Sequence, residues 1–167
     1  MFAKDERVAD AFRERWGELT EKTYLARVEG EIPEEQGVFE SHLLEDADGY
    51  RVRSVAQGGR LARTEWRRLS VEDGTTLVEV KLKSGRKNQI RVHFAEAGHA
   101  VAGDAKYGGA PSARTRWKGL CLHAWRLAFI HPRTGRRMFF ETSLPPFAKK
   151  AAPLLDAAPA QSTGGTI

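Results

Sequence analysis

The sequence predicts one α+β domain with a largely antiparallel mixed sheet and flanking helices. Runs of alternating apolar and polar residues recur about eight times along the 167 residues, as in strands with one buried face. Two or three other segments carry apolar residues at helical spacing. The connections have hairpin length and a chain of this size buries one core, so we expect an antiparallel sheet in a single domain.

The first predicted helix begins after Asp5, whose carboxylate can cap the N-terminus. Gly17 lowers helical propensity, so we expect the helix to end near it. A strand follows over residues 23–28 with apolar side chains on both faces, which is typical of the interior of a sheet. From this pattern alone, Tyr24 is expected to be a core ring. The inward stripe of the helix is Val8, Phe12, Trp16 and Leu19.

The next segment is acidic between residues 30 and 49, which predicts solvated loops and a short strand at residues 38–39. No histidine or cysteine there has metal-ligand spacing, so a metal site is not expected. Residues 50–55 and 61–69 predict a β-hairpin that turns at Gly58 and Gly59. Residues 71–74 predict a turn, and residues 75–83 predict the following strand.

The stretch from residue 84 to residue 108 is the most informative part of the chain. A helix is expected from residue 90, because Ile90, Phe94 and Ala97 share one helical face and Gly98 can close the helix. Three cations lie between the end of the strand and the first turn of this helix. Asp or Glu is more common at such a helix N-terminus, because a negative charge is stabilised by the helix dipole. The junction indicates an anion site, and a solvated turn is the alternative. The cations are Arg86, Lys87 and Arg91.

The C-terminal part predicts two strands, a short helix and a tail. Residues 121–130 and 138–142 are apolar runs joined by a turn at residues 131–135. A short helix is expected over residues 147–155, and the small polar residues from 156 onward predict disorder. We therefore expect a domain over residues 1–150 and an extension over residues 151–167.

The composition indicates a nucleic-acid partner. Residues 1–50 carry six cations against fourteen carboxylates, whereas residues 51–150 carry twenty-one against seven, and most of these cations are arginines. Arginine binds phosphate through a bidentate fork and stacks on bases. An evenly solvated charged surface is the alternative. The chain has no apolar run long enough to span a membrane and no signal-peptide pattern, so a cytoplasmic location is expected.

The remaining reactive residues are interpreted as structural. Cys121 lies in an apolar run and is expected to be a small buried residue. His93 and His99 have no third metal ligand in the pattern, so we expect both to be satisfied structural histidines. No phosphate-binding loop, dinucleotide fingerprint or catalytic triad is present in the sequence. We therefore expect neither a metal nor a cofactor.

Several motifs together resemble the RluA-type RNA pseudouridine synthases over residues 1–150. The most specific is Gly85-Arg86-x-x-Gln89-Ile90-Arg91-Val92-His93, followed by Gly103-Asp104-x-x-Tyr107-Gly108. The resemblance implies a pseudouridine synthase-like catalytic domain and the isomerisation of uridine to pseudouridine in ribosomal or transfer RNA, without cofactor or metal. The other matching motifs are Lys22-Thr23-Tyr24-Leu25-Ala26, Gly98-His99, Leu122-His123-Ala124 and His131-Pro132.

The resemblance assigns roles to particular residues. Tyr24 takes the position of the tyrosine that stacks on the flipped base. This assignment replaces the prediction, made from the strand pattern alone, that Tyr24 is a core ring. Arg91 takes the position of the cation that pairs with the catalytic aspartate. Further RNA contacts are expected at Arg86, Lys87, Gln89, Arg63 and Lys106.

The chain departs from the family pattern at its beginning. The family places its nucleophilic aspartate in a His-Arg-Leu-Asp segment ahead of a run similar to residues 2–5, and this chain contains no such segment. We expect Met1 to be an internal start, and the domain to be incomplete at the N-terminus and inactive alone. The missing part is expected to leave a strand edge and apolar surface exposed, and the complete protein to be a monomer. The alternative function is a non-catalytic RNA-binding domain.

Overall fold

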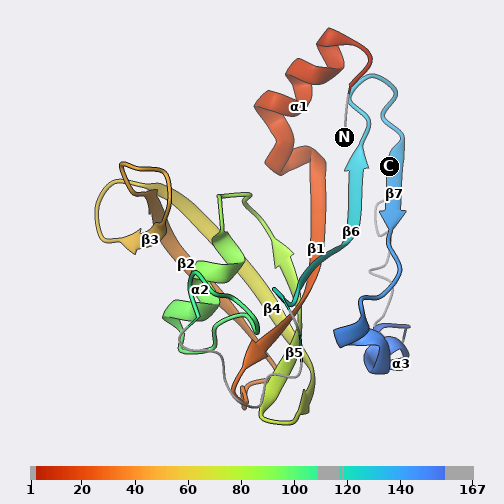
Figure 1. The fold of residues 1–167 in the computed structure, drawn as a ribbon. Helices are drawn as coiled ribbons and strands as arrows, with labels where there is room; N and C mark the ends of the chain where they lie inside the picture. The colour runs from red at the N-terminus through yellow and green to blue at the C-terminus, as the bar shows by residue number, and fades with distance from the viewer. Residues whose placement is uncertain (1–2, 109–116, 118, 157–167) are drawn as a thin grey trace.

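The computed structural model describes residues 3–108, 117 and 119–156, and it confirms the α+β class with an antiparallel sheet (Figure 1). The described strands form one seven-stranded sheet in the order β3-β2-β4-β5-β1-β6-β7. Its strands are β1 Thr20–Glu29, β2 Gln36–Glu45, β3 Val52–Val55, β4 Arg60–Glu72, β5 Thr75–Leu82, β6 Leu122–Ile130 and β7 Arg137–Glu141. The helices are α1 Glu6–Leu19, α2 Gln89–Glu96, α3 Ala152–Asp156 and the 3-10 helix η1 Pro146–Ala151.

Helix α1 is capped as the sequence predicts and ends later than expected. The Asp5 carboxylate accepts a hydrogen bond from the Val8 backbone N–H at 3.3 Å. The helix continues past Gly17 to Leu19, where the Thr20 hydroxyl donates to the Trp16 carbonyl at 2.6 Å. This bond satisfies one of the last carbonyl groups of the helix, so the helix does not need to end at the glycine.

The predicted hairpin between residues 50–55 and 61–69 is wrong, because β2 lies between β3 and β4. The short strand expected at residues 38–39 is a ten-residue strand that pairs with both of them. Gly58 and Gly59 do turn the chain, with φ of 77° and 69°, but they carry it across the end of β2. A Cβ at Gly59 would lie 2.7 Å from the Leu43 carbonyl oxygen, so this close crossing requires glycine.

The turn between β4 and β5 is shorter than predicted. Strand β4 reaches Glu72, and Asp73 and Gly74 alone reverse the chain, with φ of 54° and 68°. Positive φ at both central residues is the conformation of the tightest hairpins, and an Asp-Gly pair favours it. Gly98 follows the C-terminal end of α2 and has a φ of 84°, so it closes this helix as the sequence predicts.

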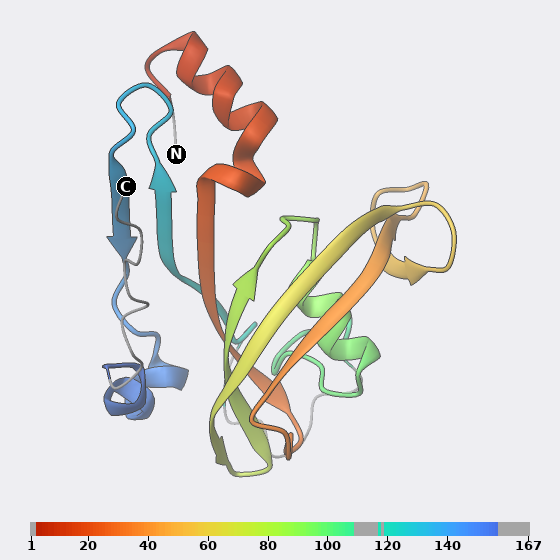
Figure 2. The same ribbon diagram turned by 180° about the vertical axis from the view of Figure 1, so that it is seen from behind.

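Helices α1 and α2 pack on the same face of the sheet. Thr64, Leu82 and Lys22 are aligned across β4, β5 and β1, so their side chains share one face. Thr64 bonds to Gln89 and His93 of α2, which places α2 on that face. Helix α1 reaches the same face further along, as Figure 1 and its reverse view, Figure 2, show. Its Phe12 ring contacts Phe129, the partner of Thr20 in β1, with centroids 5.3 Å apart.

The opposite face carries η1. Arg27 of β1 is buried there and donates two hydrogen bonds to the Phe147 carbonyl oxygen, at 2.9 and 3.2 Å. Ala151 and Leu155, which lie beyond the predicted domain limit at residue 150, are buried in the main core cluster. The predicted disordered tail lies outside the described residues, apart from Asp156, which ends α3.

Strand β7 forms one edge of the sheet and exposes apolar side chains. Phe139 and Phe140 are 58% and 52% exposed. Neither α1 nor any other helix in the described ranges has the length and apolar character that crossing a bilayer requires.

Cys121 is buried, as its apolar surroundings predict. Burial raises the pKa of its thiol to about 11, so the thiolate is scarce at neutral pH. The cysteine is therefore a packing residue and not a nucleophile.

We predict opposite effects for alanine at two glycines. A Cβ at Gly37 would lie 2.5 Å from the Trp66 ring, whereas a Cβ at Gly17 would have no neighbour nearer than 3.9 Å. Gly37→Ala should lower the free energy of unfolding by about 1–3 kcal/mol through overpacking. Gly17→Ala should raise it by about 0.5–1 kcal/mol, because alanine favours the helix. Urea unfolding of both variants measures this, and equal effects at the two positions would contradict the packing.

Candidate functional site

The start of α2 is fixed to the sheet by the amide of Gln89. Its oxygen accepts hydrogen bonds from the Ser84 hydroxyl at 2.8 Å and the Arg86 backbone N–H at 3.0 Å. Its nitrogen donates to the Arg63 carbonyl oxygen at 3.0 Å and the Thr64 hydroxyl at 2.9 Å. The side chain is buried and all of these partners belong to the protein, so Gln89 holds the junction in place.

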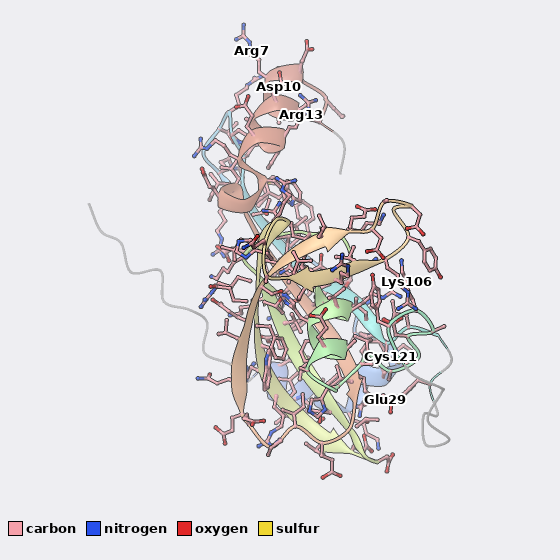
Figure 3. The ribbon with its side chains drawn as sticks, turned by 90° about the vertical axis from the view of Figure 1, so that its left-hand side faces the viewer. Arg7, Asp10, Arg13, Glu29, Lys106 and Cys121 are labelled. Atoms are coloured by element: carbon pink, nitrogen blue, oxygen red, sulfur yellow. The ribbon has the colours of Figure 1, made fainter. Side chains whose placement is uncertain are left out.

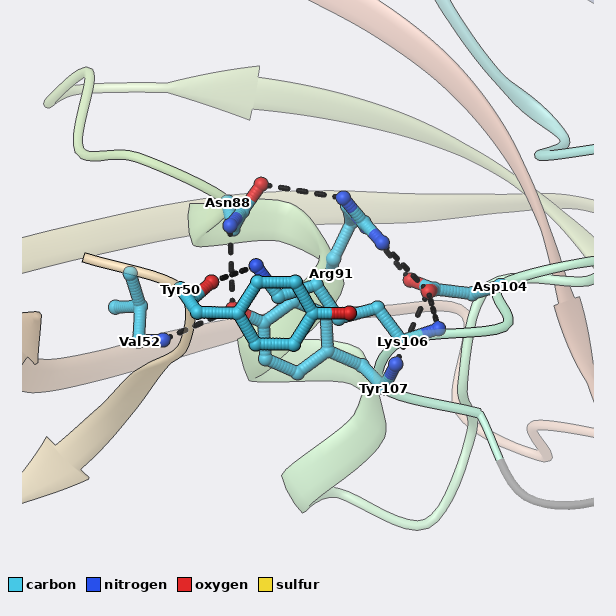
Figure 4. Close-up of polar contacts among 7 residues, drawn as sticks. All are labelled: Tyr50, Val52, Asn88, Arg91, Asp104, Lys106 and Tyr107. Carbon is cyan, nitrogen blue, oxygen red and sulfur yellow. Dashed lines mark hydrogen bonds and ion pairs between the residues drawn. The ribbon is translucent and has the colours of Figure 1, made fainter. Parts of the chain in front are cut away.

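Arg91 forms a bidentate ion pair with Asp104 (Figure 4). Its Nε and Nη2 atoms lie 2.7 Å from the two carboxylate oxygens, and Nη1 donates to the Asn88 side-chain oxygen at 3.2 Å. The Asp104 side chain is fully buried and that of Arg91 is 20% exposed. The guanidinium of Arg91, which the family resemblance assigns to the catalytic aspartate, is paired here with Asp104.

Asp104 also organises the loop that follows it. One of its oxygens accepts from the backbone N–H groups of Lys106 and Tyr107, at 2.9 and 3.0 Å. Burial alone would raise the pKa of Asp104, but these bonds and the Arg91 charge together hold the pKa below its ordinary value. The same ion pair raises the pKa of Arg91. Both groups are therefore charged at neutral pH.

A cluster of tyrosines and cations surrounds Arg91. The Tyr107 hydroxyl accepts hydrogen bonds from the Val52 backbone N–H at 3.0 Å and from the Asn88 amide at 3.2 Å. Figure 4 shows the Tyr50 ring in front of the Tyr107 ring. Tyr50 is 61% exposed and has the Lys106 ammonium 4.1 Å from its ring centre. Among the described residues, the cations within 6 Å of the Tyr107 ring centre are Arg91, Lys106 and Arg51.

Tyr24 lies on the sheet face that carries α2. It is aligned with Val80 of β5 and Trp66 of β4, and Trp66 packs near Phe94 of α2. The ring is half-buried, and burial raises the pKa of its hydroxyl, so the phenol is neutral at physiological pH. Tyr24 and the helix that carries Arg91 therefore lie on the same face of the sheet. No hydrogen bond joins the two residues among those described.

The predicted RNA contacts divide between the two faces. Arg63 points away from α2 and pairs with Glu40 at 2.9 Å and Glu65 at 3.3 Å. The others lie around α2, where Lys87 pairs with Glu45 and bonds the Gly49 carbonyl oxygen. Arg86 donates to the Leu61 carbonyl oxygen at 3.1 Å, and Lys106 bonds the Tyr50 carbonyl oxygen.

Lys22, which belongs to a matching motif but received no role from it, lies two residues before Tyr24 in β1. Its side chain is only 8% exposed, and its ammonium nitrogen has no hydrogen-bond partner in the described part of the chain. Burial lowers the pKa of Lys22, and the nearby charge of Arg86 lowers it further. The sequence could have indicated this residue, because side chains two residues apart in a strand lie on the same face and Lys22 stands two residues before Tyr24.

The histidines are structural, as predicted. His93 is buried between the hydroxyl groups of Thr64 and Ser41, at 2.9 and 3.0 Å, and burial lowers its pKa. His99 contacts the Glu29 carbonyl oxygen through Nδ1 at 3.0 Å. No group of three metal-ligating side chains occurs within the described ranges.

Comparison with known proteins identifies the family. Residues 1–96 match the family model described as RNA pseudouridylate synthase, so the chain belongs to that family. It is 38% identical over 124 residues to the "Uncharacterized RNA pseudouridine synthase YlyB" of Bacillus subtilis, covering 74% of this chain and 40% of that protein. It is 36% identical over 132 residues to the "Dual-specificity RNA pseudouridine synthase RluA" of Yersinia pestis, covering 78% and 62%.

A solved structure supports the fold. The human RNA pseudouridylate synthase domain containing 1 superposes with a TM-score of 0.68 at 24% identity, over 88% of this chain and 62% of that one. The chain thus spans less than two thirds of each of these three proteins. The expected membership of the RluA type is confirmed.

We predict that Asp104→Asn destabilises the protein in a pH-dependent way. Losing one partner of this buried ion pair should cost about 3 kcal/mol near neutral pH. Since the folded-state pKa of Asp104 is lowered, its stabilising effect is full above the unfolded value near 3.9 and is lost as pH falls below it. Urea unfolding from pH 7 to pH 3 should therefore show the variant and the wild type converging in acid.

Asp46→Asn is the matched control for this experiment. Asp46 pairs with Arg53 at 3.3 Å on the surface, where an ion pair contributes less than about 1 kcal/mol. An Asp104→Asn variant as stable as Asp46→Asn at pH 7 would contradict the structural role given to the Arg91–Asp104 pair.

Proposed function

We propose that this chain forms the RNA-holding part of a pseudouridine synthase active site, which acts on uridine in ribosomal or transfer RNA. Membership of the family is the observation that carries the proposal. The placement of Tyr24 and α2 on the same face of the sheet supports it. In the reaction the C1′–N1 bond of uridine breaks, the base turns, and C1′ bonds to C5 while N1 gains and C5 loses a proton.

In this proposal Tyr24 provides the platform for the flipped base. Extruding a base from RNA loses its stacking, and an aromatic ring offsets part of that cost. The hydroxyl is protonated at neutral pH already at the ordinary tyrosine pKa of about 10, and burial raises the pKa further, so the ring presents no negative charge to the uracil. The ring is partly buried, so packing against the protein restricts its orientation before RNA arrives.

Arg91 is proposed to orient a catalytic carboxylate. Two of its three guanidinium nitrogens are held by Asp104, and the third makes the longer bond to Asn88 at 3.2 Å. A second carboxylate could replace the Asn88 oxygen at Nη1 without disturbing the Asp104 pair. A cation at that place would keep the carboxylate ionised.

A non-catalytic RNA-binding role is the second candidate for this chain. Its described aspartates near the N-terminus are used by α1, where Asp5 caps the helix and Asp10 pairs with Arg13. Asp104 is committed to Arg91. This arrangement favours RNA binding without chemistry when the chain acts alone.

We expect the chain to bind uridine-containing RNA and to form no pseudouridine by itself. Mapping pseudouridine after incubation with ribosomal and transfer RNA tests the chemistry. The logarithm of RNA affinity should fall steeply with the logarithm of salt concentration, because bound phosphates release counterions. Product formation by the chain would show that one of its own aspartates is the nucleophile, and a flat salt response would argue against an RNA surface.

We predict that Tyr24→Ala weakens RNA binding about tenfold or more, since stacking on one base contributes about 1–3 kcal/mol. Tyr24→Phe keeps the ring and should bind nearly as the wild type does. Fluorescence anisotropy with a labelled uridine-containing oligonucleotide measures both. Equal losses for the two variants would assign the effect to the hydroxyl group instead of the ring.

A further inference from the structure

We propose that Lys22 and Arg86 form an anion site that holds a phosphate of the RNA backbone beside Tyr24. The inference rests on the proposed function and adds a binding contact to it. It does not involve Arg91, whose charge is compensated by Asp104. The site is built from β1 and from the turn that leads into α2.

The first observation is the state of the Lys22 ammonium group. The side chain is more than nine-tenths buried, and its nitrogen has no acceptor within the described ranges. The Trp16 ring of α1 lies 6.0 Å from that nitrogen and offers only a weak cation–π contact. Burying an unpaired ammonium group is costly, so an anion at this place would be bound favourably.

The second observation is that Arg86, a cation, follows Gly85, whose Cβ position lies 3.6 Å from the Lys22 nitrogen. Arg86 acts on Lys22 as a like charge, and no ion pair of either residue with a carboxylate occurs in the described part of the chain. The Arg86 guanidinium donates a hydrogen bond from Nε to the Leu61 carbonyl oxygen. One anion between the two side chains would relieve their repulsion.

Gly85 lies over this place. The residue is exposed, and a Cβ built on it would lie 3.6 Å from the Lys22 nitrogen. The nitrogen itself is fully covered, so an anion approaches it only if this glycine turn shifts, and a methyl group at Gly85 would hinder that approach. The N-terminal end of α2 follows this turn, and the helix dipole adds to the positive potential.

The position relative to Tyr24 favours a phosphate as the anion. Lys22 and Tyr24 lie two residues apart on one strand, which places their side chains on the same face at a spacing of roughly 7 Å. A nucleotide whose base stacks on Tyr24 would carry its own phosphate toward Lys22. The several oxygens of a phosphate can bind an ammonium and a guanidinium group together.

Binding of uridine 5′-monophosphate and of uridine to the chain tests the proposal. Calorimetric titration of the wild type should give tighter binding of the monophosphate by about tenfold or more, since a charge-assisted hydrogen bond contributes roughly that factor. Lys22→Met should reduce the two affinities to the same value. Gly85→Ala should do so too, because it blocks the approach and keeps both charges.

Lys83→Met is the matched control, since Lys83 pairs with Glu65 at 3.7 Å and should leave the monophosphate affinity unchanged. Thermal unfolding provides a second test, because a role of Lys22 in packing alone would not make the melting temperature depend on phosphate. Inorganic phosphate should raise the melting temperature of the wild type and of Lys83→Met but not that of Lys22→Met. In phosphate-free buffer, Lys22→Met should melt at or above the wild-type temperature, because a buried unpaired charge is removed.

Equal binding of uridine and its monophosphate by the wild type would overturn the proposal. So would a monophosphate affinity that Lys22→Met leaves unchanged. In the second case, if Tyr24→Ala still weakened the binding of uridine, the proposed function would stand and only the phosphate site would be rejected.

Discussion

The buried amide of Gln89 is the contact on which the geometry of this molecule depends. It bonds to Ser84, Arg86, Arg63 and Thr64, and so joins β4, the turn after β5 and the first residue of α2. A buried amide with all of these partners fixes one arrangement, because leaving any of them unpaired is costly. The direction of α2, and with it the positions of Arg86 and Arg91, follows from this one side chain.

Two helices on one face of the sheet define where function can reside. Helix α1 covers β6 through Phe12 and Phe129, and α2 covers β4 through Thr64. Strand β1 lies between those two strands, separated from β4 by β5. It places Lys22 and Tyr24 on the same face as the helices. The sheet thus brings together residues that belong to the first and second halves of the chain.

Local signals made much of this fold predictable from sequence. The Asp5 cap, the strand leading to residue 82 and the glycine after α2 each depend on a few neighbouring residues. The pairing of β2 with β4 could not be predicted, because the apolar residues of β2 stand in adjacent pairs, Val38-Phe39 and Leu43-Leu44, instead of alternating, and its partner is distant in sequence. The same limit applies to the site. Motif spacing indicated Tyr24 and Arg91, but only coordinates reveal that Asp104 holds the arginine and that Lys22 is unpaired.

The ion pairs on the face opposite α2 have a consequence for long-range electrostatics. Arg63 and Arg67 are neutralised there by neighbouring glutamates. These ion pairs lower the positive potential of this face, so it attracts a polyanion less strongly than its arginines alone would.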